Sequence, residues 1–272
     1  MFRSHTDPAG VLSERPPALL AVASRNLARL RPSKLRSGTR RRLFTYRVSH
    51  FPAQPVGELV EVGTVYGGWV IPADVDATWT CYCIGMGGDL SLERHLLERG
   101  ARVRSVDPVE RFVVEGRDEF EHVGRFTAHH AAVATWDGVI EMQRHHEAVS
   151  SSLSAAHLYD SAATVTVPAI TLSSLMDALG DSHIDLLKVD VEGLEYELIP
   201  TLDLAGIGLR ALAVQVHHNG SVSRARELVA AVEAQGYVYA AQRPACKLLF
   251  VAPSAAAADR QPEPEPSRAI HS

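Results

Sequence analysis

Two short segments hold the residues whose types and spacing could do chemistry. The first, residues 82–108, places Gly85, Gly87 and Asp89 in one turn, and Asp107 follows 22 positions after Gly85. A glycine-rich turn between a strand and a helix lets a ligand approach the backbone, and the free N–H groups of the helix point at it. An acid about 20 residues further on, at the end of the next strand, can bind a ribose. The spacing therefore predicts a site for an adenosine-containing cofactor.

The third position of the turn motif distinguishes between cofactors. A dinucleotide fingerprint requires a third glycine where this chain has Leu90. The carboxylate of Asp89 is a poor neighbour for a pyrophosphate but a good one for a cation. S-adenosylmethionine carries a sulfonium, an ammonium and a ribose, without a phosphate, so the turn favours it over NAD. The alternative function is an NAD-dependent oxidoreductase. Alternatively, the turn binds no ligand: its glycines only make a tight connection between strand and helix, and Asp89 only caps the helix.

The second segment, residues 183–199, carries Asp190 and Glu192 after a predicted central strand. In a parallel sheet, ligands bind outside the carboxyl ends of the strands, so these acids should face the same crevice as the glycine turn. We expect both side chains to point the same way, because they are two residues apart in extended chain. They can orient a substrate hydroxyl, bind the ammonium of a cofactor or contribute to a divalent metal site, although two acids do not define one. Alternatively, Glu192 caps the next helix and Lys188 pairs with an acid.

The elements that must position these residues alternate between short apolar runs and helical patterns, which predicts a parallel sheet covered by helices. A hairpin is expected at residues 58–72, a capped helix from Thr171 to Gly180 and a closing antiparallel pair at the sheet edge. Further strands are expected at residues 78–85, 101–107, 125–134, 184–190 and 210–218, a hairpin extension at 139–145 and a helix at 224–236.

Composition and charge divide the 272 residues into three regions. Residues 1–57 form a basic, partly helical arm with a net charge of +9, residues 58–253 a single domain, and residues 254–272 a disordered tail. Arginines 25, 29 and 31 beside leucines of helical spacing suit either contact with an anionic membrane surface or packing on the domain. Nucleic-acid binding is not expected, because the arm has few aromatic residues and the rest of the chain carries −14.

The three cysteines do not suggest disulfides, because Cys81 and Cys83 share one face of a strand and Cys246 is remote in sequence. No apolar run is long enough to span a membrane, and no secretory signal is evident. We therefore expect a cytoplasmic protein, with possible peripheral contact at the inner membrane surface through the arm. The oligomeric state stays open.

The chain resembles FkbM-type methyltransferases over about residues 60–252. The resemblance rests on residues 82–108, on DGVIEM followed by VSSSLS, on residues 170–199 with their IDLLKVDVEG element, and on LAVQVHHN. It implies an α/β class I methyltransferase (Rossmann-like) fold, a seven-stranded mostly parallel sheet with an antiparallel edge strand and helices on both faces. It also implies S-adenosylmethionine-dependent O-methylation of a hydroxyl on a sugar, glycolipid or secondary metabolite.

Carried over residue by residue, the resemblance puts Gly85, Gly87 and Asp89 in the cofactor loop and Asp107 on the ribose. It puts Asp190, Glu192 and His217 on the rim that receives a small-molecule or glycan acceptor.

His217 is the expected base, because the free imidazole has a pKa near neutrality. Relatives often have an acid two residues before this histidine, where the chain has Gln215. A binding protein that has lost catalysis is therefore a further alternative.

Overall fold

The computed structural model describes residues 42–48, 51–64, 68–144, 151–152, 164–217 and 221–252. The chain divides into two compact units, Met1–Leu43 and Phe44–Ser272, and the fold below belongs to the second. Within the basic arm, residues 42–48 are helical, whereas the predicted amphipathic stretch around residues 19–31 and the predicted tail lie outside the described residues.

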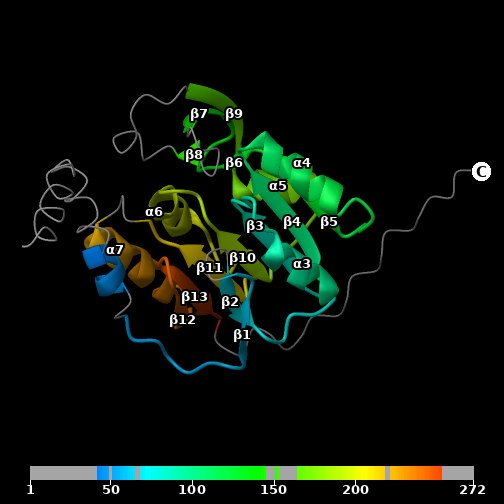
Figure 1. Ribbon diagram of the computed structural model, residues 1–272. Coiled ribbons are helices and arrows are strands. Elements are labelled where there is room, and N and C mark those ends of the chain that lie inside the picture. Colours follow the sequence, from blue (N-terminus) through cyan, green and yellow to red (C-terminus); the bar gives the residue numbers. More distant parts are fainter. Residues whose placement is uncertain are drawn as a thin grey trace, which may run out of the picture. The chain divides into compact units, whose positions relative to one another are not determined.

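A seven-stranded sheet forms the centre of the second unit, in the order β12-β13-β11-β10-β3-β4-β5 (Figure 1). The strands are β3 (Thr80–Ile84), β4 (Arg102–Asp107), β5 (Phe126–His130), β10 (Leu186–Val189), β11 (Ala211–Gln215), β12 (Val238–Arg243) and β13 (Lys247–Val251). Pairing is parallel from β11 through β10, β3 and β4 to β5, and β13 is antiparallel to both of its neighbours. The predicted seven-stranded, mostly parallel sheet is confirmed.

The antiparallel strand, however, is not the edge strand. β12 occupies the edge, and β13 lies between it and β11. Only residues 244–246 separate β12 from β13, so the chain must reverse into a hairpin, and β13 then completes a five-pair ladder with β11. The expected antiparallel pair is correct, but the expected antiparallel edge strand is wrong by one place.

Helices cover both faces of the sheet, as expected, and the central strands β3 and β10 are therefore buried on both sides (Figure 1). One face packs on α5 (Leu172–Leu179), α6 (Glu195–Leu198), the 3-10 helix η1 (Ile199–Thr201) and α7 (Val222–Glu233). The other packs on α3 (Ser91–Glu98), α4 (Glu110–Glu119) and the predicted hairpin of β1 (Leu59–Val62) and β2 (Trp69–Pro72).

The ends of α5 follow its sequence signals. The hydroxyl of Thr171 accepts a hydrogen bond from the amide of Ser174 at the start, and Gly180 ends the helix in the left-handed conformation. The apolar residues between them, spaced at three and four, face the core.

A small second sheet, ordered β6-β9-β7-β8, differs most from expectation. It contains β6 (Ala132–Val133), β7 (Gly138–Arg144), β8 (Ser151–Ser152) and β9 (Thr164–Ile170). The single strand expected at residues 125–134 is divided, with β5 in the large sheet and β6 paired with β9. The expected extension is β7, whose antiparallel partner is β9.

Two further observations concern the cysteines and the lengths of the helices. Cys81, Cys83 and Cys246 are free and buried. Within the described ranges, every helix is too short or too polar to cross a bilayer.

Candidate active site

The candidate site lies where the strand order reverses. The chain runs from β3 outward to β4 and β5, and later returns to place β10 on the other side of β3. Ligands of open α/β sheets bind at such a switch point, outside the carboxyl ends of the two strands. Here the glycine turn follows β3 and Asp190 follows β10, so the two predicted motifs are neighbours.

The glycine turn packs directly against the backbone after β10. Gly85 has φ +76°, and a Cβ there would overlap the carbonyl oxygen of Asp190. The amide of Gly85 donates to Val106 at 2.8 Å, and the amide of Asp190 donates to Ile84 at 2.9 Å. Gly87, with φ +65°, has open space where a Cβ would point. The turn is therefore closed toward Asp190 and open at Gly87.

Asp107 holds this turn from the end of β4. Its Oδ2 accepts a hydrogen bond from the amide of Gly87 at 2.9 Å, and its Oδ1 accepts one from the amide of Val109 at 2.7 Å. Burial raises the pKa of Asp107 against the effect of these two bonds. The carboxylate thus links the predicted ribose position to the predicted cofactor loop.

Asp89 lies at the start of α3. Its Oδ1 accepts from the amide of Ser91 at 3.1 Å and its Oδ2 accepts from the hydroxyl of Thr64 at 2.8 Å. Burial acts to raise its pKa, but these hydrogen bonds lower it overall. Asp89 therefore joins the hairpin β1–β2 to the glycine turn as an anion.

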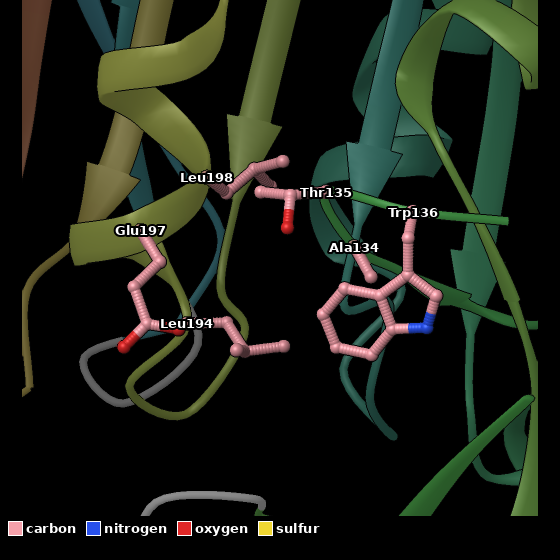
Figure 2. A pocket seen from close by; sticks show the side chains of 6 residues that line it. All are labelled: Ala134, Thr135, Trp136, Leu194, Glu197 and Leu198. Carbon is pink, nitrogen blue, oxygen red and sulfur yellow. The ribbon is translucent and has the colours of Figure 1, made fainter.

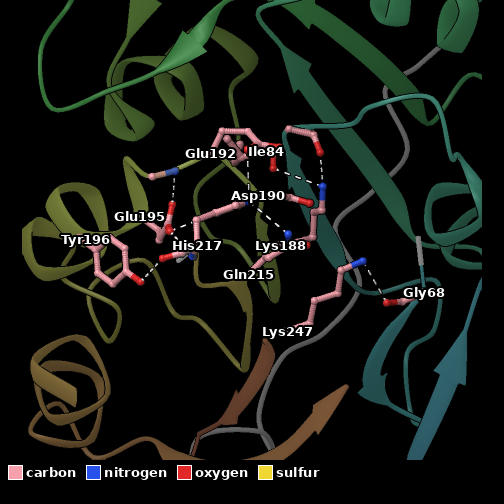
Figure 3. A network of polar contacts seen from close by, with 12 residues as sticks. Gly68, Ile84, Lys188, Asp190, Glu192, Glu195, Tyr196, Gln215, His217 and Lys247 are labelled. Carbon is pink, nitrogen blue, oxygen red and sulfur yellow. Dashed lines mark hydrogen bonds and ion pairs between the residues drawn. The ribbon is translucent and has the colours of Figure 1, made fainter. Parts of the chain in front are cut away.

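His217 is the centre of a partly buried polar network (Figure 3). Its Nδ1 lies 3.1 Å from Oε1 of Glu195, and its backbone amide donates to the same oxygen at 2.7 Å. Its Nε2 lies 3.5 Å from carboxylate oxygens of both Asp190 and Glu192. The hydroxyl of Tyr196 donates to its carbonyl at 2.7 Å. The imidazole is held from both sides, so its orientation is fixed.

The charge of the imidazole follows from this setting. Burial alone would lower the pKa of His217, but the hydrogen bond with Glu195 and the charges of the three carboxylates outweigh it. Together they raise the pKa to about 9. A histidine of that pKa is mostly an imidazolium at neutral pH. The site therefore holds a proton that a free imidazole would largely have lost.

The two predicted acids converge by a route other than the one expected. Glu192 is in the left-handed region with φ +51°, so the chain turns after Asp190 and is not extended. A non-glycine residue in this region is strained and needs support from its surroundings. Here the amide of Gly193 donates to Oε2 of Glu195 at 2.7 Å and helps to hold the turn. Both acids reach His217 because of this turn.

The same three side chains can hold a divalent cation. One ligand atom from each of Asp190, Glu192 and His217 lies within 4.8 Å of the others. Glu195 on Nδ1 would then act as the outer carboxylate that often orients a metal-binding histidine. The imidazolium between the carboxylates satisfies the same charges without a metal, so this geometry is compatible with either state.

Sequence reasoning missed Glu195, which is fully buried and contacts the ring of His217. An acid on the inward face of a short apolar helix could have indicated it, because a buried acid requires a partner. Gln215, which stands where relatives often have an acid, lies with its Nε2 3.1 Å from Nε2 of His217. His217 thus receives its acidic hydrogen-bond partner from α6.

A small pocket opens beside the turn that follows Asp190. It is lined by Ala134, Thr135, Trp136, Leu194, Glu197 and Leu198 (Figure 2). The indole of Trp136 and the side chain of Leu194 point toward one another across it. Trp136 is 45% exposed, which is unusual for so large an apolar group. Because Leu194 belongs to the turn that carries Glu192, the pocket adjoins the polar network.

The sheet defines an α/β protein, and the polar network at its carboxyl edge forms a candidate ligand site at the switch point. Residues 88–239 match the family model described as methyltransferase FkbM domain, and the chain belongs to the FkbM methyltransferase family. The match contains Asp89, Asp107, Asp190, Glu192 and His217, and it begins just after Gly87. Neither the search of curated proteins nor the search of solved structures gave a match.

Proposed function

We propose that the protein is an S-adenosylmethionine-dependent O-methyltransferase that acts on a hydroxyl of a sugar, glycolipid or secondary metabolite. The observation that carries the proposal is the direct packing of the glycine turn against Asp190, because it brings the proposed cofactor loop next to the proposed proton-accepting cluster. The three free cysteines support a reducing, cytoplasmic setting.

The residues fit the proposed cofactor. Gly87 leaves room where a side chain would otherwise stand, and Asp89 offers a negative charge suited to a cationic ligand. Each oxygen of Asp107 already accepts one backbone hydrogen bond and has a second lone pair for a ribose hydroxyl. The anionic turn and Leu90 disfavour the pyrophosphate of NAD.

The chemistry requires alignment and the removal of one proton. When bound, the cofactor supplies a methyl group on a sulfonium, which an acceptor oxygen attacks in line. We assign the acceptor to the pocket beside Trp136, with its hydroxyl directed to the network. The hydroxyl proton moves to Nε2 of neutral His217, while Glu195 holds Nδ1 and stabilises the imidazolium that forms. Asp190 and Glu192 orient the acceptor hydroxyl.

Ligand binding tests the cofactor class. S-adenosylhomocysteine should raise the melting temperature of the full chain, and NAD should not. The reverse result would favour the oxidoreductase alternative. Stabilisation by S-adenosylhomocysteine without methyl transfer to any of a panel of hydroxyl acceptors would favour a binding protein.

The base is tested by His217→Ala, for which we expect a loss of methyl transfer of about 100-fold or more. The matched control is His183→Ala, which removes a histidine that also lies beside an acid, Asp185, at 3.2 Å but at the opposite edge of the sheet. The control should keep its activity. Full methyl transfer by His217→Ala across the pH range would disprove the assignment.

A further inference from the structure

Lys247 lies at the carboxyl edge of the sheet, a position that local sequence patterns did not suggest. It is the first residue of β13, and it pairs with Gln215, the last residue of β11. Only 6% of it is exposed. Its Nζ donates to the carbonyl of Gly68 at 3.3 Å (Figure 3) and lies 4.6 Å from the ring centroid of Trp69. A lysine this buried needs compensating charge or a ligand.

A second ammonium group lies against the same indole but has a structural role. Nζ of Lys188 is 5.2 Å from the centroid of Trp69 and donates to the carbonyl oxygens of Ile84 and Gly85. Its positive charge also lowers the pKa of the nearby buried acid Glu93, although burial outweighs this and raises that pKa to about 7. Lys188 thus supports the glycine turn from behind.

Lys247 interacts instead with the acids of the site. Burial lowers its pKa to about 8, while the charges of Asp190 and Asp89 act in the opposite direction. The charge of Lys247 in turn helps to keep Asp89 ionised. Both groups also contact the turn between β1 and β2. The hydroxyl of Thr64 donates to Asp89, and the amide of Gly68, whose carbonyl accepts from Lys247, donates to the carbonyl of Thr64 at 2.8 Å. An anion of the glycine turn and a cation from β13 therefore lie against the same hairpin turn.

An α-amino acid has the complementary charges, a carboxylate and an ammonium on one carbon. We propose that Lys247 binds the α-carboxylate, and Asp89 the α-ammonium, of the methionine part of the cofactor. This inference rests on the proposed function. Charge-assisted hydrogen bonds of this kind are about twice as strong as neutral ones, so the pair also selects against adenosine ligands that lack the amino acid.

The test is calorimetric titration of the full chain with three ligands: S-adenosylhomocysteine, its decarboxylated form, and 5′-methylthioadenosine, which lacks the whole amino acid. We expect the wild type to bind S-adenosylhomocysteine about 10- to 100-fold more tightly than the decarboxylated form. Lys247→Met should bind these two ligands equally within about twofold and leave the affinity for 5′-methylthioadenosine unchanged. Lys247→Arg should retain most of the preference.

Arg210→Met is the matched control. Arg210 is also a partly buried cation stacked on a tryptophan, 4.1 Å from the centroid of Trp79, but it lies at the amino end of β11. Arg210→Met should show the same ligand preferences as the wild type.

Titration with free methionine tests whether the subsite binds an amino-acid acceptor and not the cofactor. Tight binding of methionine that S-adenosylhomocysteine does not displace would overturn the assignment to the cofactor.

The outcomes separate this inference from the proposed function. Equal binding of S-adenosylhomocysteine and its decarboxylated form by the wild type would overturn the inference alone, whether or not Lys247→Met folds. Equal weakening of all three ligands by Lys247→Met would also overturn it. If the wild type binds none of them, both the inference and the proposed function fail.

Discussion

At the scale of single residues, the protonation state of His217, the proposed base, sets the pH range in which the proposed reaction can run. A base with a pKa of about 9 is a stronger proton acceptor than a free imidazole, but few molecules carry it in the neutral form at pH 7. The buried acid Glu195 contributes both its charge and a hydrogen bond to this shift. A higher pKa therefore makes neutral His217 a stronger proton acceptor but lowers the fraction of molecules in which His217 is neutral.

We predict that methyl transfer rises with pH up to about 9, because deprotonation of His217 limits the active fraction. Glu195→Gln removes a neighbouring negative charge, lowers the pKa of His217 and should move the rising limb of kcat/KM about one unit or more toward acid. Gln215→Glu adds a charge beside Nε2 and should move it toward alkali. Rates measured from pH 6 to 10 for the three proteins check this.

Opposite displacements by the two variants would identify His217 as the titrating group. If both variants keep the wild-type profile, the proton goes elsewhere. Because Gly193 also donates to Glu195, the folded fraction of Glu195→Gln should be verified by circular dichroism.

At the scale of elements, the glycine turn shows how two glycines in one loop can have separate tasks. Gly85 is required because its Cβ would occupy the position of the Asp190 carbonyl. Gly87 has a similarly positive φ, but a Cβ there would meet no atom of the described residues within 4 Å. The first glycine therefore serves the junction of β3 and β10, and the second leaves room for the proposed ligand.

This difference predicts different costs for the same substitution. Gly87→Ala should lower the free energy of unfolding by only about 1 kcal/mol, the cost of a left-handed alanine, while weakening S-adenosylhomocysteine at least tenfold. Gly85→Ala adds a steric overlap with backbone and should cost about 3 kcal/mol or more. Urea unfolding measures the costs, and calorimetry measures the binding by Gly87→Ala. Equal stability of the two variants would contradict the division of roles.

At the scale of the whole molecule, the predictable features are those encoded over short stretches of sequence. The capped helix α5, the hairpin β1–β2 and the glycine turn each depend on residues a few positions apart, so turn chemistry and periodicity indicated them. Strand β9 and the division of β5 from β6 depend on pairing between distant segments, which local patterns do not encode. Helix α4 was missed because its buried stripe is short, with Phe112, Val113 and Gly116 as its buried residues.

The site shows the same limit. Asp190 and the glycine turn could be placed together because parallel strands align their carboxyl ends. Glu195 and Lys247 could not be placed at the site from the sequence. The contact of Glu195 with His217 depends on a strained turn at Glu192, and the position of Lys247 depends on the direction of β13.

The charge distribution of the full chain carries a prediction of its own. Residues 1–57 have a net charge of +9 while the rest has −14, so the arm should attract anionic lipid without help from the domain. We expect co-sedimentation with phosphatidylserine-containing vesicles that falls as salt rises, and little with neutral vesicles. Replacing Arg25, Arg29 and Arg31 by glutamine should reduce it, and unchanged binding by this variant would contradict the role of the arm.

The reversed direction of β13 has a practical consequence for work with the protein. Because the strand begins at Lys247 beside the site, it ends on the opposite side of the sheet, where the amide of Ala252 bonds to the carbonyl of Arg210 before β11 begins. A fluorophore or immobilisation handle attached just after Ala252 therefore starts about one strand length from the ligand. The carboxyl-terminal side is the better point of attachment for surface-based binding assays, because the handle would not compete with a ligand at the candidate site.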